Sequence, residues 1–109
     1  MFLAAREGKE EAVQMLLDAG SDVSLRCKKN GDTPLIIACC DGHFKVVSKL
    51  LAAGSDVDGP NYNGWTPLIY AAYYNYQDVV RVLIAHKANL NSTSQVQYGV
   101  ILAILLVNV

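Results

Sequence analysis

The sequence predicts an all-α solenoid, a stack of helix-turn-helix units joined by hairpin-like loops. The first reason is an internal repeat, because residues 31–38 (GDTPLIIA) recur 33 positions later as residues 64–71 (GWTPLIYA). The second is that apolar pairs spaced i,i+4 follow each copy, as in helices with one buried face. The third is that Gly, Pro, Asn and Asp cluster between the units, which indicates turns. A period of this length is typical of solenoids, whose units bury each other's apolar faces.

The first helix of each complete unit is expected to begin at a Thr-Pro pair. Thr33 and Thr66 are good N-cap residues. The proline after each one is well tolerated there, because the first N–H groups of a helix have no hydrogen-bond partner within the helix and proline lacks an N–H. Gly42 follows about two turns later and can adopt the left-handed conformation that commonly ends a helix. Each Thr-Pro pair therefore predicts one short helix.

A second helix is expected directly after this turn. Its apolar positions form i,i+4 pairs in both units, namely Val46/Leu50, Val47/Leu51, Val79/Leu83 and Val80/Ile84. Four polar residues fall between them and are expected to face solvent: Lys45, Lys49, Asp78 and Arg81. Gly54 ends this helix, Gly20 ends the corresponding helix one unit earlier, and the turn-rich segment 55–63 leads to the next Thr-Pro pair.

The unit resembles the ankyrin repeat, whose pattern is close to G-x-T-P-L-H-x-A-A-x-x-G-H, then V-x-x-L-L, then G-A-D-x-N. The resemblance divides the chain into a partial repeat over residues 1–24 and complete repeats over 25–58 and 59–91. The partial repeat lacks the Gly-x-Thr-Pro opening, and its offset of 34 implies one extra residue in the first connecting loop.

The chain departs from the family pattern at four positions. Ile36 and Ile69 replace the histidine after Thr-Pro-Leu, so the Thr-to-His hydrogen bond common in the family cannot form and apolar contact must substitute. Asn75 and Lys87 stand where the pattern has glycine at the two turns of the third repeat. These turns are therefore expected to be less ideal, although Asn tolerates the left-handed conformation better than other non-glycine residues.

Both ends of the chain are irregular. Residues 92–109 contain no charged residue, and no Thr-Pro-Leu appears where a fourth repeat would begin, near position 97. Three interpretations of this apolar segment stay open: an improvised cap over the third repeat, a poorly ordered or strand-forming segment prone to aggregation, and a surface for docking to a partner, to a membrane or to a second copy. Because solenoids end in repeats with a polar outer face, we also interpret the chain as a fragment, an alternative product or a piece of a longer array.

Composition excludes several classes of function. The chain is 52% hydrophobic and 17% charged, with a net charge of −1, so it matches neither a disordered chain nor a nucleic-acid binder with a basic stripe. Its longest apolar run, residues 100–107, is far shorter than the roughly 20 residues of a membrane-spanning helix, and no secretory signal is visible. Three cysteines without disulfide or metal-ligand spacing favour a reducing, intracellular compartment, with the cytoplasm as the expected location.

No catalytic, cofactor or metal site is predicted. His43 and His86 fall at a turn and at a helix end, where capping explains them. Cys39 aligns with alanines and is expected in the core, whereas Cys40 aligns with an inward-facing position and is expected to be an exposed thiol. A nucleophile would need an adjacent base and an orienting group, and the glycines form no phosphate-binding loop. We therefore expect no enzyme activity.

The resemblance implies that loop tips and inner helices contact protein partners. Five of the nine aromatic residues fall within positions 62–74, and aromatic residues are enriched at binding hot spots. The expected partner-binding residues are Arg6, Glu7, Lys28, Lys29, Asp32, Cys40, Asp41, Tyr62, Trp65, Tyr73 and Tyr74. Tyr70 is expected instead to pack between repeats, and Tyr76 to cover the turn where the family has histidine.

Two smaller features carry hypotheses of their own. Arg26, Lys28 and Lys29 form a basic cluster, interpreted as a solvated loop tip or as a contact for an acidic partner. Asn91 matches a position that an asparaginyl hydroxylase can modify in ankyrin proteins, which gives a hydroxylation hypothesis. Taken as a whole, the sequence predicts a non-catalytic protein-interaction module, with a truncated or aberrant product that has no independent binding function as the alternative.

Overall fold

The structure, a computed structural model, describes residues 1–90. Within them the chain forms six α-helices: α1 (Phe2–Glu7), α2 (Glu10–Asp18), α3 (Pro34–Cys40), α4 (Phe44–Ala52), α5 (Pro67–Tyr73) and α6 (Gln77–Ala85). None of these six is both long enough and apolar enough to cross a membrane. The expectations for residues 92–109 and for Asn91 lie outside the described residues.

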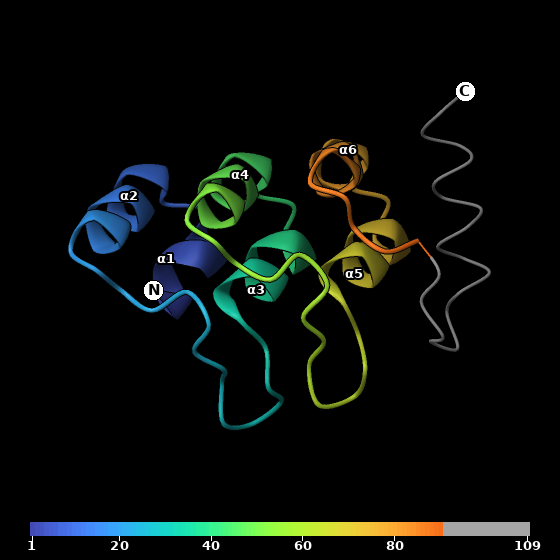
Figure 1. The fold of residues 1–109 in the computed structure, drawn as a ribbon, viewed down its shortest axis with the longest axis horizontal. Coiled ribbons are helices and arrows are strands. Elements are labelled where there is room, and N and C mark those ends of the chain that lie inside the picture. Colours follow the sequence, from blue (N-terminus) through green and yellow to red (C-terminus); the bar gives the residue numbers. More distant parts are fainter. Residues whose placement is uncertain (91–109) are drawn as a thin grey trace.

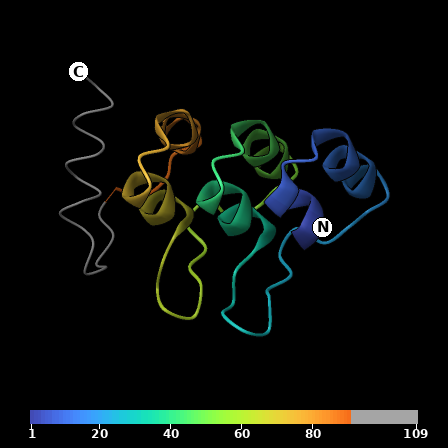
Figure 2. The ribbon, with the colours of Figure 1, turned by 180° about the vertical axis from the view of Figure 1, so that it is seen from behind.

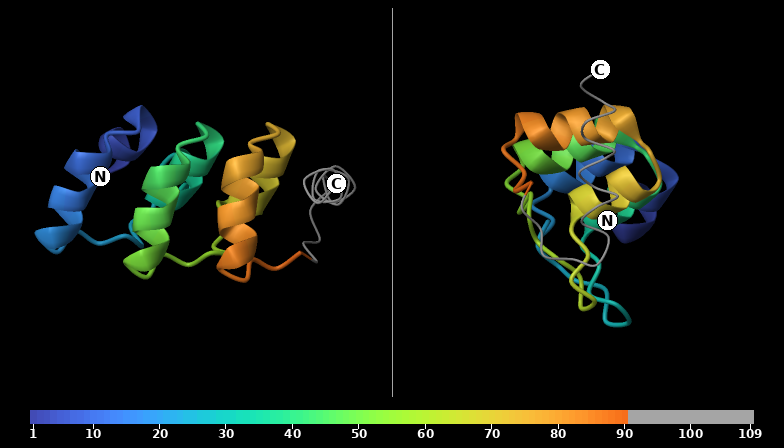
Figure 3. Two further views of the ribbon diagram at one scale, coloured as in Figure 1. Left: turned by 90° about the horizontal axis from the view of Figure 1, so that it is seen from above. Right: turned by 90° about the vertical axis from the view of Figure 1, so that its right-hand side faces the viewer.

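The helices form two layers (Figure 1). The inner helices α1, α3 and α5 lie side by side in one layer and the outer helices α2, α4 and α6 in the other, while the two connecting loops project beyond the inner layer (Figure 2). Seen from above, the three helix pairs stand in a row (Figure 3). Because α3 packs against both α1 and α5, and α4 against both α2 and α6, the predicted all-α solenoid is confirmed.

The Thr-Pro pairs begin the inner helices as predicted. The hydroxyl oxygen of Thr33 accepts a hydrogen bond from the N–H of Ile36 at 3.2 Å, and that of Thr66 accepts one from Ile69 at 3.2 Å. Each such cap contributes about 1 kcal/mol. Helix α1 begins after Met1, which forms no side-chain cap.

The two turns of the third repeat reproduce the left-handed geometry of the second with different residues. Asn75 has φ 60° and Lys87 has φ 65°, whereas Gly42 and Gly54 at the corresponding turns have φ 77° and 98°. A residue with a Cβ loses roughly 1–2 kcal/mol in this conformation. The two turns of the third repeat are therefore less favourable than those of the second, because non-glycine residues occupy their left-handed positions.

The core consists of the apolar faces that neighbouring repeats bury against each other. Six of the paired valines and leucines of the outer helices are at most 1% exposed: Val46, Val47, Leu50, Val79, Val80 and Leu83. Ile36 and Ile69 are 0% exposed, so buried apolar contact takes the place of the family's histidine. Each fully buried aliphatic side chain contributes roughly 1.5–3 kcal/mol.

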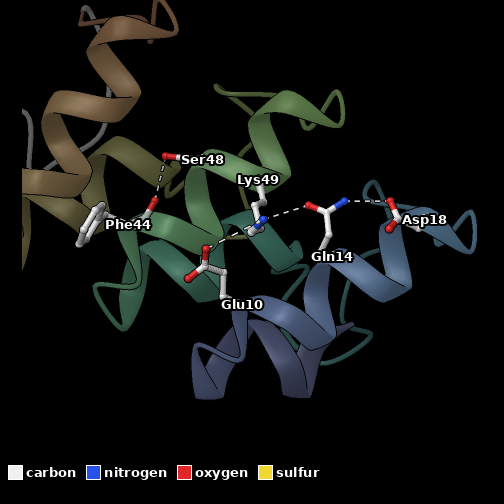
Figure 4. Close-up of polar contacts among 6 residues, drawn as sticks. All are labelled: Glu10, Gln14, Asp18, Phe44, Ser48 and Lys49. Carbon is white, nitrogen blue, oxygen red and sulfur yellow. Dashed lines mark hydrogen bonds and ion pairs between the residues drawn. The ribbon is translucent and has the colours of Figure 1, made fainter.

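One of the four polar residues expected to face solvent lies between two helices instead. The Nζ atom of Lys49 on α4 donates a hydrogen bond to Oε1 of Gln14 on α2 at 3.0 Å, and it lies 4.0 Å from Oε1 of Glu10 (Figure 4). The Lys49 side chain is only 28% exposed. The solvent-facing prediction is therefore wrong for Lys49, because stacking places α2 beside it, while the other three residues are exposed.

Candidate functional site

Near the C-terminal end of each inner helix, two adjacent residues occupy equivalent positions in the three repeats. Together they form two neighbouring rows that run across the repeats. The rows consist of Arg6, Cys40 and Tyr73, and of Glu7, Asp41 and Tyr74. The residues just before them are buried at Ala5, Cys39 and Ala72. Five of the six side chains in the rows are exposed and the sixth is half-buried. Stacking of the repeats therefore leaves these side chains available on one surface.

The two connecting loops are closed by backbone hydrogen bonds near their bases. In the first loop the N–H of Cys27 donates to the carbonyl oxygen of Asp32 at 2.8 Å, and in the second the N–H of Asn61 donates to that of Trp65 at 2.9 Å. Asp32 and Trp65 thus occupy corresponding places, directly before the Thr-Pro pairs. Lys28 and Lys29, two of the expected partner-binding residues, are exposed in the first loop between Cys27 and Asp32.

The two loops are also fastened to each other. The N–H of Tyr62 donates to the carbonyl oxygen of Asn30 at 2.9 Å. The guanidinium of Arg26 donates to the carbonyl oxygens of Pro60 and Gly31. The predicted basic cluster thus has its first member engaged in a contact between loops, so that residue is not a free solvated charge.

Asn61 was not predicted as a site residue, yet it organises the base of the loops. It is 5% exposed, and its Nδ2 donates to the carboxylate of Asp32 at 3.0 Å and to the hydroxyl of Tyr70 at 3.1 Å. Its Oδ1 accepts the N–H groups of Asn63 and Trp65, both at 3.0 Å. An asparagine at the start of a turn-rich loop is the signal that could have indicated this role, because its side chain can accept the backbone N–H two residues later in an Asx turn.

Four aromatic side chains of the third repeat lie in contact and are called here the aromatic patch: Trp65, Tyr70, Tyr73 and Tyr74. The ring centroid of Trp65 lies 4.7 Å from that of Tyr70 and 5.5 Å from that of Tyr73. Tyr74 lies 5.1 Å from Tyr73 and 6.4 Å from Tyr70. Tyr73 and Tyr74 are 61% and 47% exposed. The patch therefore combines mutual support with an open surface.

His43 and Tyr76 occupy corresponding positions, and each ring covers a glycine of the preceding repeat. A Cβ atom at Gly8 would lie 2.5 Å from the His43 ring, and one at Gly42 would lie 2.8 Å from the Tyr76 ring. The Nε2 atom of His43 also lies 2.8 Å from the carbonyl oxygen of Arg6. The prediction that Tyr76 covers a turn is confirmed, and His43 is engaged in packing and in a hydrogen bond.

The two adjacent thiols of α3 differ in burial, because Cys39 is buried and Cys40 is half-buried. Burial raises the pKa of the Cys39 thiol well above its ordinary value of 9.0. Burial also raises the pKa of Cys40, and the nearby carboxylates of Asp41 and Asp32 raise it further. Cys40 is half-buried. The expectation of an exposed thiol at position 40 is therefore wrong, because its neighbours partly cover it.

Within residues 1–90, no group of three or more His, Cys, Asp or Glu side chains is arranged to hold a metal ion. One hollow of about 520 Å³ lies between α2 and α4, and its lining includes Gln14, Leu17 and Lys49 (Figure 4). None of the predicted partner-binding residues lines this hollow.

The structure thus gathers some of the predicted site residues and leaves others apart. Asp32, Cys40, Asp41 and the aromatic patch are linked through hydrogen bonds, ring contacts or charge effects. The two residues on α1 continue the rows one repeat away, and the loop-tip residues lie beyond the loop bases.

Comparisons of the sequence with known proteins identify relatives of this chain. A family model for ankyrin repeats, in three copies, matches residues 1–94. The chain is 34% identical over 94 residues to protein phosphatase 1 regulatory subunit 12A of Mus musculus, 33% over 86 residues to potassium channel AKT1 of Oryza sativa subsp. indica, and 35% over 88 residues to E3 ubiquitin-protein ligase XBAT33 of Arabidopsis thaliana. These alignments cover 81%, 79% and 80% of this chain but 9%, 9% and 17% of the relatives.

Proposed function

The chain belongs to the ankyrin-repeat family, and from this premise we propose that it is a non-catalytic module that binds a protein partner through its inner helices and loop tips. Ankyrin repeats are generally protein–protein interaction modules. The binding residues in this proposal are Arg6, Glu7, Lys28, Lys29, Asp32, Cys40, Asp41, Tyr62, Trp65, Tyr73 and Tyr74.

The observation that carries the proposal is the pair of rows along the inner helices. At the positions just before the rows, the side chains of Ala5 and Cys39 are 0% exposed and that of Ala72 is 6% exposed. The rows themselves vary between basic, acidic, polar and aromatic residues from repeat to repeat. A surface that is held in place by a buried core and differs in chemistry along its length is suited to recognising one partner rather than to stacking.

The relatives support a binding role over a shared catalytic one. Their names describe a phosphatase regulatory subunit, a potassium channel and a ubiquitin ligase, while this chain spans less than a fifth of each. Because the matched segment is common to proteins with such different activities, its common role is better explained by interaction than by any one of these activities.

Two further elements belong to this proposal. The repeat units span residues 1–24, 25–58 and 59–91, which matches the order of the three helix pairs in the described part. The module works in a reducing, intracellular compartment, because its three cysteines are all unpaired.

The test is partner capture followed by a binding measurement. The tagged full chain is used to purify associated proteins from cells, and each identified protein is titrated against purified chain. The double variant Trp65→Ala/Tyr73→Ala is expected to weaken binding by about 2 kcal/mol, which is roughly 30-fold, while circular dichroism shows unchanged helix content.

The matched control is Glu11→Ala/Arg81→Ala, which removes two exposed side chains from the outer helices. This variant is expected to bind as the unaltered chain does. Equal affinity of the Trp65/Tyr73 variant and the unaltered chain would contradict the proposed surface. Failure of the folded full chain to retain any protein would favour the alternative of a product without independent binding function.

A further inference from the structure

A buried amide links one carboxylate of the second repeat, Asp32, to the aromatic patch of the third repeat. Asp32 corresponds in register to Trp65, and Asp41 corresponds to Tyr74, so the acidic residues stand one repeat away from their aromatic counterparts. The amide of Asn61 joins the two groups, with Nδ2 at 3.0 Å from Oδ1 of Asp32 and 3.1 Å from the Tyr70 hydroxyl. The Asp32 carboxylate and the aromatic patch are therefore held together by one buried amide.

The carboxylates on this surface are not neutralised within the described residues. The two ion pairs of residues 1–90 join Lys49 to Glu10 and Arg81 to Asp78, and both lie on outer helices. Asp41 is exposed, and Asp32 is half-buried with its carboxylate accepting from Asn61. An acidic side chain without a cationic partner attracts one from solvent or from a binding protein.

Two basic side chains lie near these carboxylates: Arg6 continues the inner row one repeat away, and Arg26 donates to the carbonyl oxygen of Gly31, directly before Asp32. At the Cys40 thiol the carboxylates of Asp41 and Asp32 raise the pKa, while Arg6 lowers it by a smaller amount than either carboxylate raises it. At this thiol the two carboxylates therefore outweigh Arg6.

The aromatic rings add attraction for the same kind of charge. Tyr73 and Tyr74 meet edge to face, with 89° between their planes, and are 61% and 47% exposed. The face of an aromatic ring is the negative end of its quadrupole, so a lysine or arginine placed over it is attracted, with a larger effect when water is excluded.

We propose that the aromatic patch, together with Asp32 and Asp41, binds a lysine or arginine side chain of a basic protein segment. This inference rests on the proposed function and adds the chemistry of the partner. The rings contact the aliphatic stem and the cationic head, and the two carboxylates neutralise the charge. Carboxylates at this place repel phosphate groups, so the surface favours a basic peptide over a nucleic acid.

The experiment uses the full chain and three labelled peptides of equal length: hexa-arginine, hexa-glutamate and an uncharged Gly-Ser peptide. Binding is measured by fluorescence anisotropy at about 0.15 M salt, where long-range charge effects are largely screened. Hexa-arginine is expected to bind and the other two peptides are not.

Four variants separate the local site from net charge. Asp32→Asn/Asp41→Asn is expected to weaken hexa-arginine binding about tenfold and Tyr73→Leu about fivefold, whereas Tyr73→Phe, which keeps the ring, is expected to lose less affinity than Tyr73→Leu. The matched control Glu11→Gln/Asp78→Asn removes the same charge from exposed positions on α2 and α6 and is expected to leave binding within twofold. Circular dichroism verifies that each variant is folded.

Three results would overturn the inference: no binding of hexa-arginine, equal binding of hexa-glutamate, or the same loss in the control pair as in the Asp32/Asp41 pair. The proposed function is judged separately. If the Trp65→Ala/Tyr73→Ala variant loses a captured protein while hexa-arginine does not bind, the interaction module stands and the basic-segment chemistry is wrong. If hexa-arginine binds as expected but no protein is retained, the cation site stands and the module proposal fails.

Discussion

The ring of Tyr76 covers Gly42 so closely that a Cβ atom at residue 42 would lie 2.8 Å from Cε1 of that ring. Tyr76 belongs to the repeat that follows Gly42, and His43 covers Gly8 in the same way one repeat earlier. Each contact joins the turn of one helix pair to the start of the next outer helix. The turns therefore take part in the stacking of repeats as well as in reversing the chain.

We predict that Gly42→Ala destabilises the fold by about 2–3 kcal/mol. Gly42 has φ 77°, a conformation that costs a residue with a Cβ roughly 1–2 kcal/mol, and displacement of the Tyr76 ring adds to this cost. The free energy of unfolding, measured by urea denaturation, reports the loss.

The control for Gly42 is Gly54→Ala. Gly54 has φ 98°, but a Cβ there would meet nothing within 4 Å, so only the conformational cost applies and a loss of about 1–2 kcal/mol is expected. Equal losses in the two variants would show that the ring contact does not contribute to stability.

Lys87→Gly is expected to stabilise the chain by about 0.5–1 kcal/mol. Lys87 follows His86, the C-cap of helix α6, and has φ 65°. Glycine adopts this conformation without a Cβ penalty, although it gains entropy in the unfolded chain. Thermal melts of Lys87→Gly and Lys87→Ala separate conformation from charge, because the alanine variant removes the charge but keeps the Cβ. A gain in both variants would assign the effect to the charge.

Much of the fold could be predicted because its signals are local. The Thr33 cap depends on residues three positions apart, and the buried stripe of the outer helices depends on i,i+4 spacing. Contacts between repeats depend on which side chains meet after stacking. Arg26 reaches Pro60, 34 positions later, and Lys49 reaches Gln14, 35 positions earlier, so local sequence patterns predicted neither contact.

In the candidate site too, some features could be predicted from the sequence and others could not. Register between repeats predicted which positions lie in rows on the inner helices, because equal spacing along the sequence becomes adjacency in a solenoid. The burial of Cys40 and the hydrogen bonds of Asn61 depend on side chains from two repeats together. These features could not be predicted without the three-dimensional positions of the neighbouring side chains.

Replacing Asn61 by alanine is expected to cost about 2–3 kcal/mol. The side chain is 5% exposed and makes four hydrogen bonds, two of them to the backbone N–H groups of Asn63 and Trp65. Buried groups left without a partner carry their full desolvation cost. Asn63→Ala, at an exposed side chain of the same loop, serves as the control and should change stability by less than about 0.5 kcal/mol. A loss no larger than that of the control would contradict the structural role of Asn61.

Stability is expected to fall as the pH rises above about 9, and Cys39 should account for part of this fall. Burial holds the folded pKa of Cys39 well above the ordinary value of 9.0, so above that pH the unfolded chain releases a proton that the folded chain keeps. The loss approaches about 1.4 kcal/mol per pH unit for one such group.

The measurement is the free energy of unfolding between pH 8 and pH 10, a range that ends where Tyr70, whose pKa burial raises above 10.0, begins to contribute in the same direction. Cys39→Ala places in the second repeat the residue that the other repeats carry at positions 5 and 72, and its stability should depend less on pH in this range. Asn63→Ala, which removes no titratable group, is the control and should follow the unaltered chain. An unchanged slope in Cys39→Ala would contradict the assignment.

Lys49→Ala is expected to destabilise the chain by about 1 kcal/mol, more than Lys45→Ala on the same helix. The Nζ atom of Lys49 donates to Gln14 at 3.0 Å across the interface between α2 and α4, whereas Lys45 is exposed. Exposed charged residues typically change stability by less than about 0.5 kcal/mol. A double-mutant cycle with Gln14→Ala should give a coupling of about 0.5–1 kcal/mol, because the two side chains touch directly. Additive losses would instead assign the effect to packing of the lysine stem against α2.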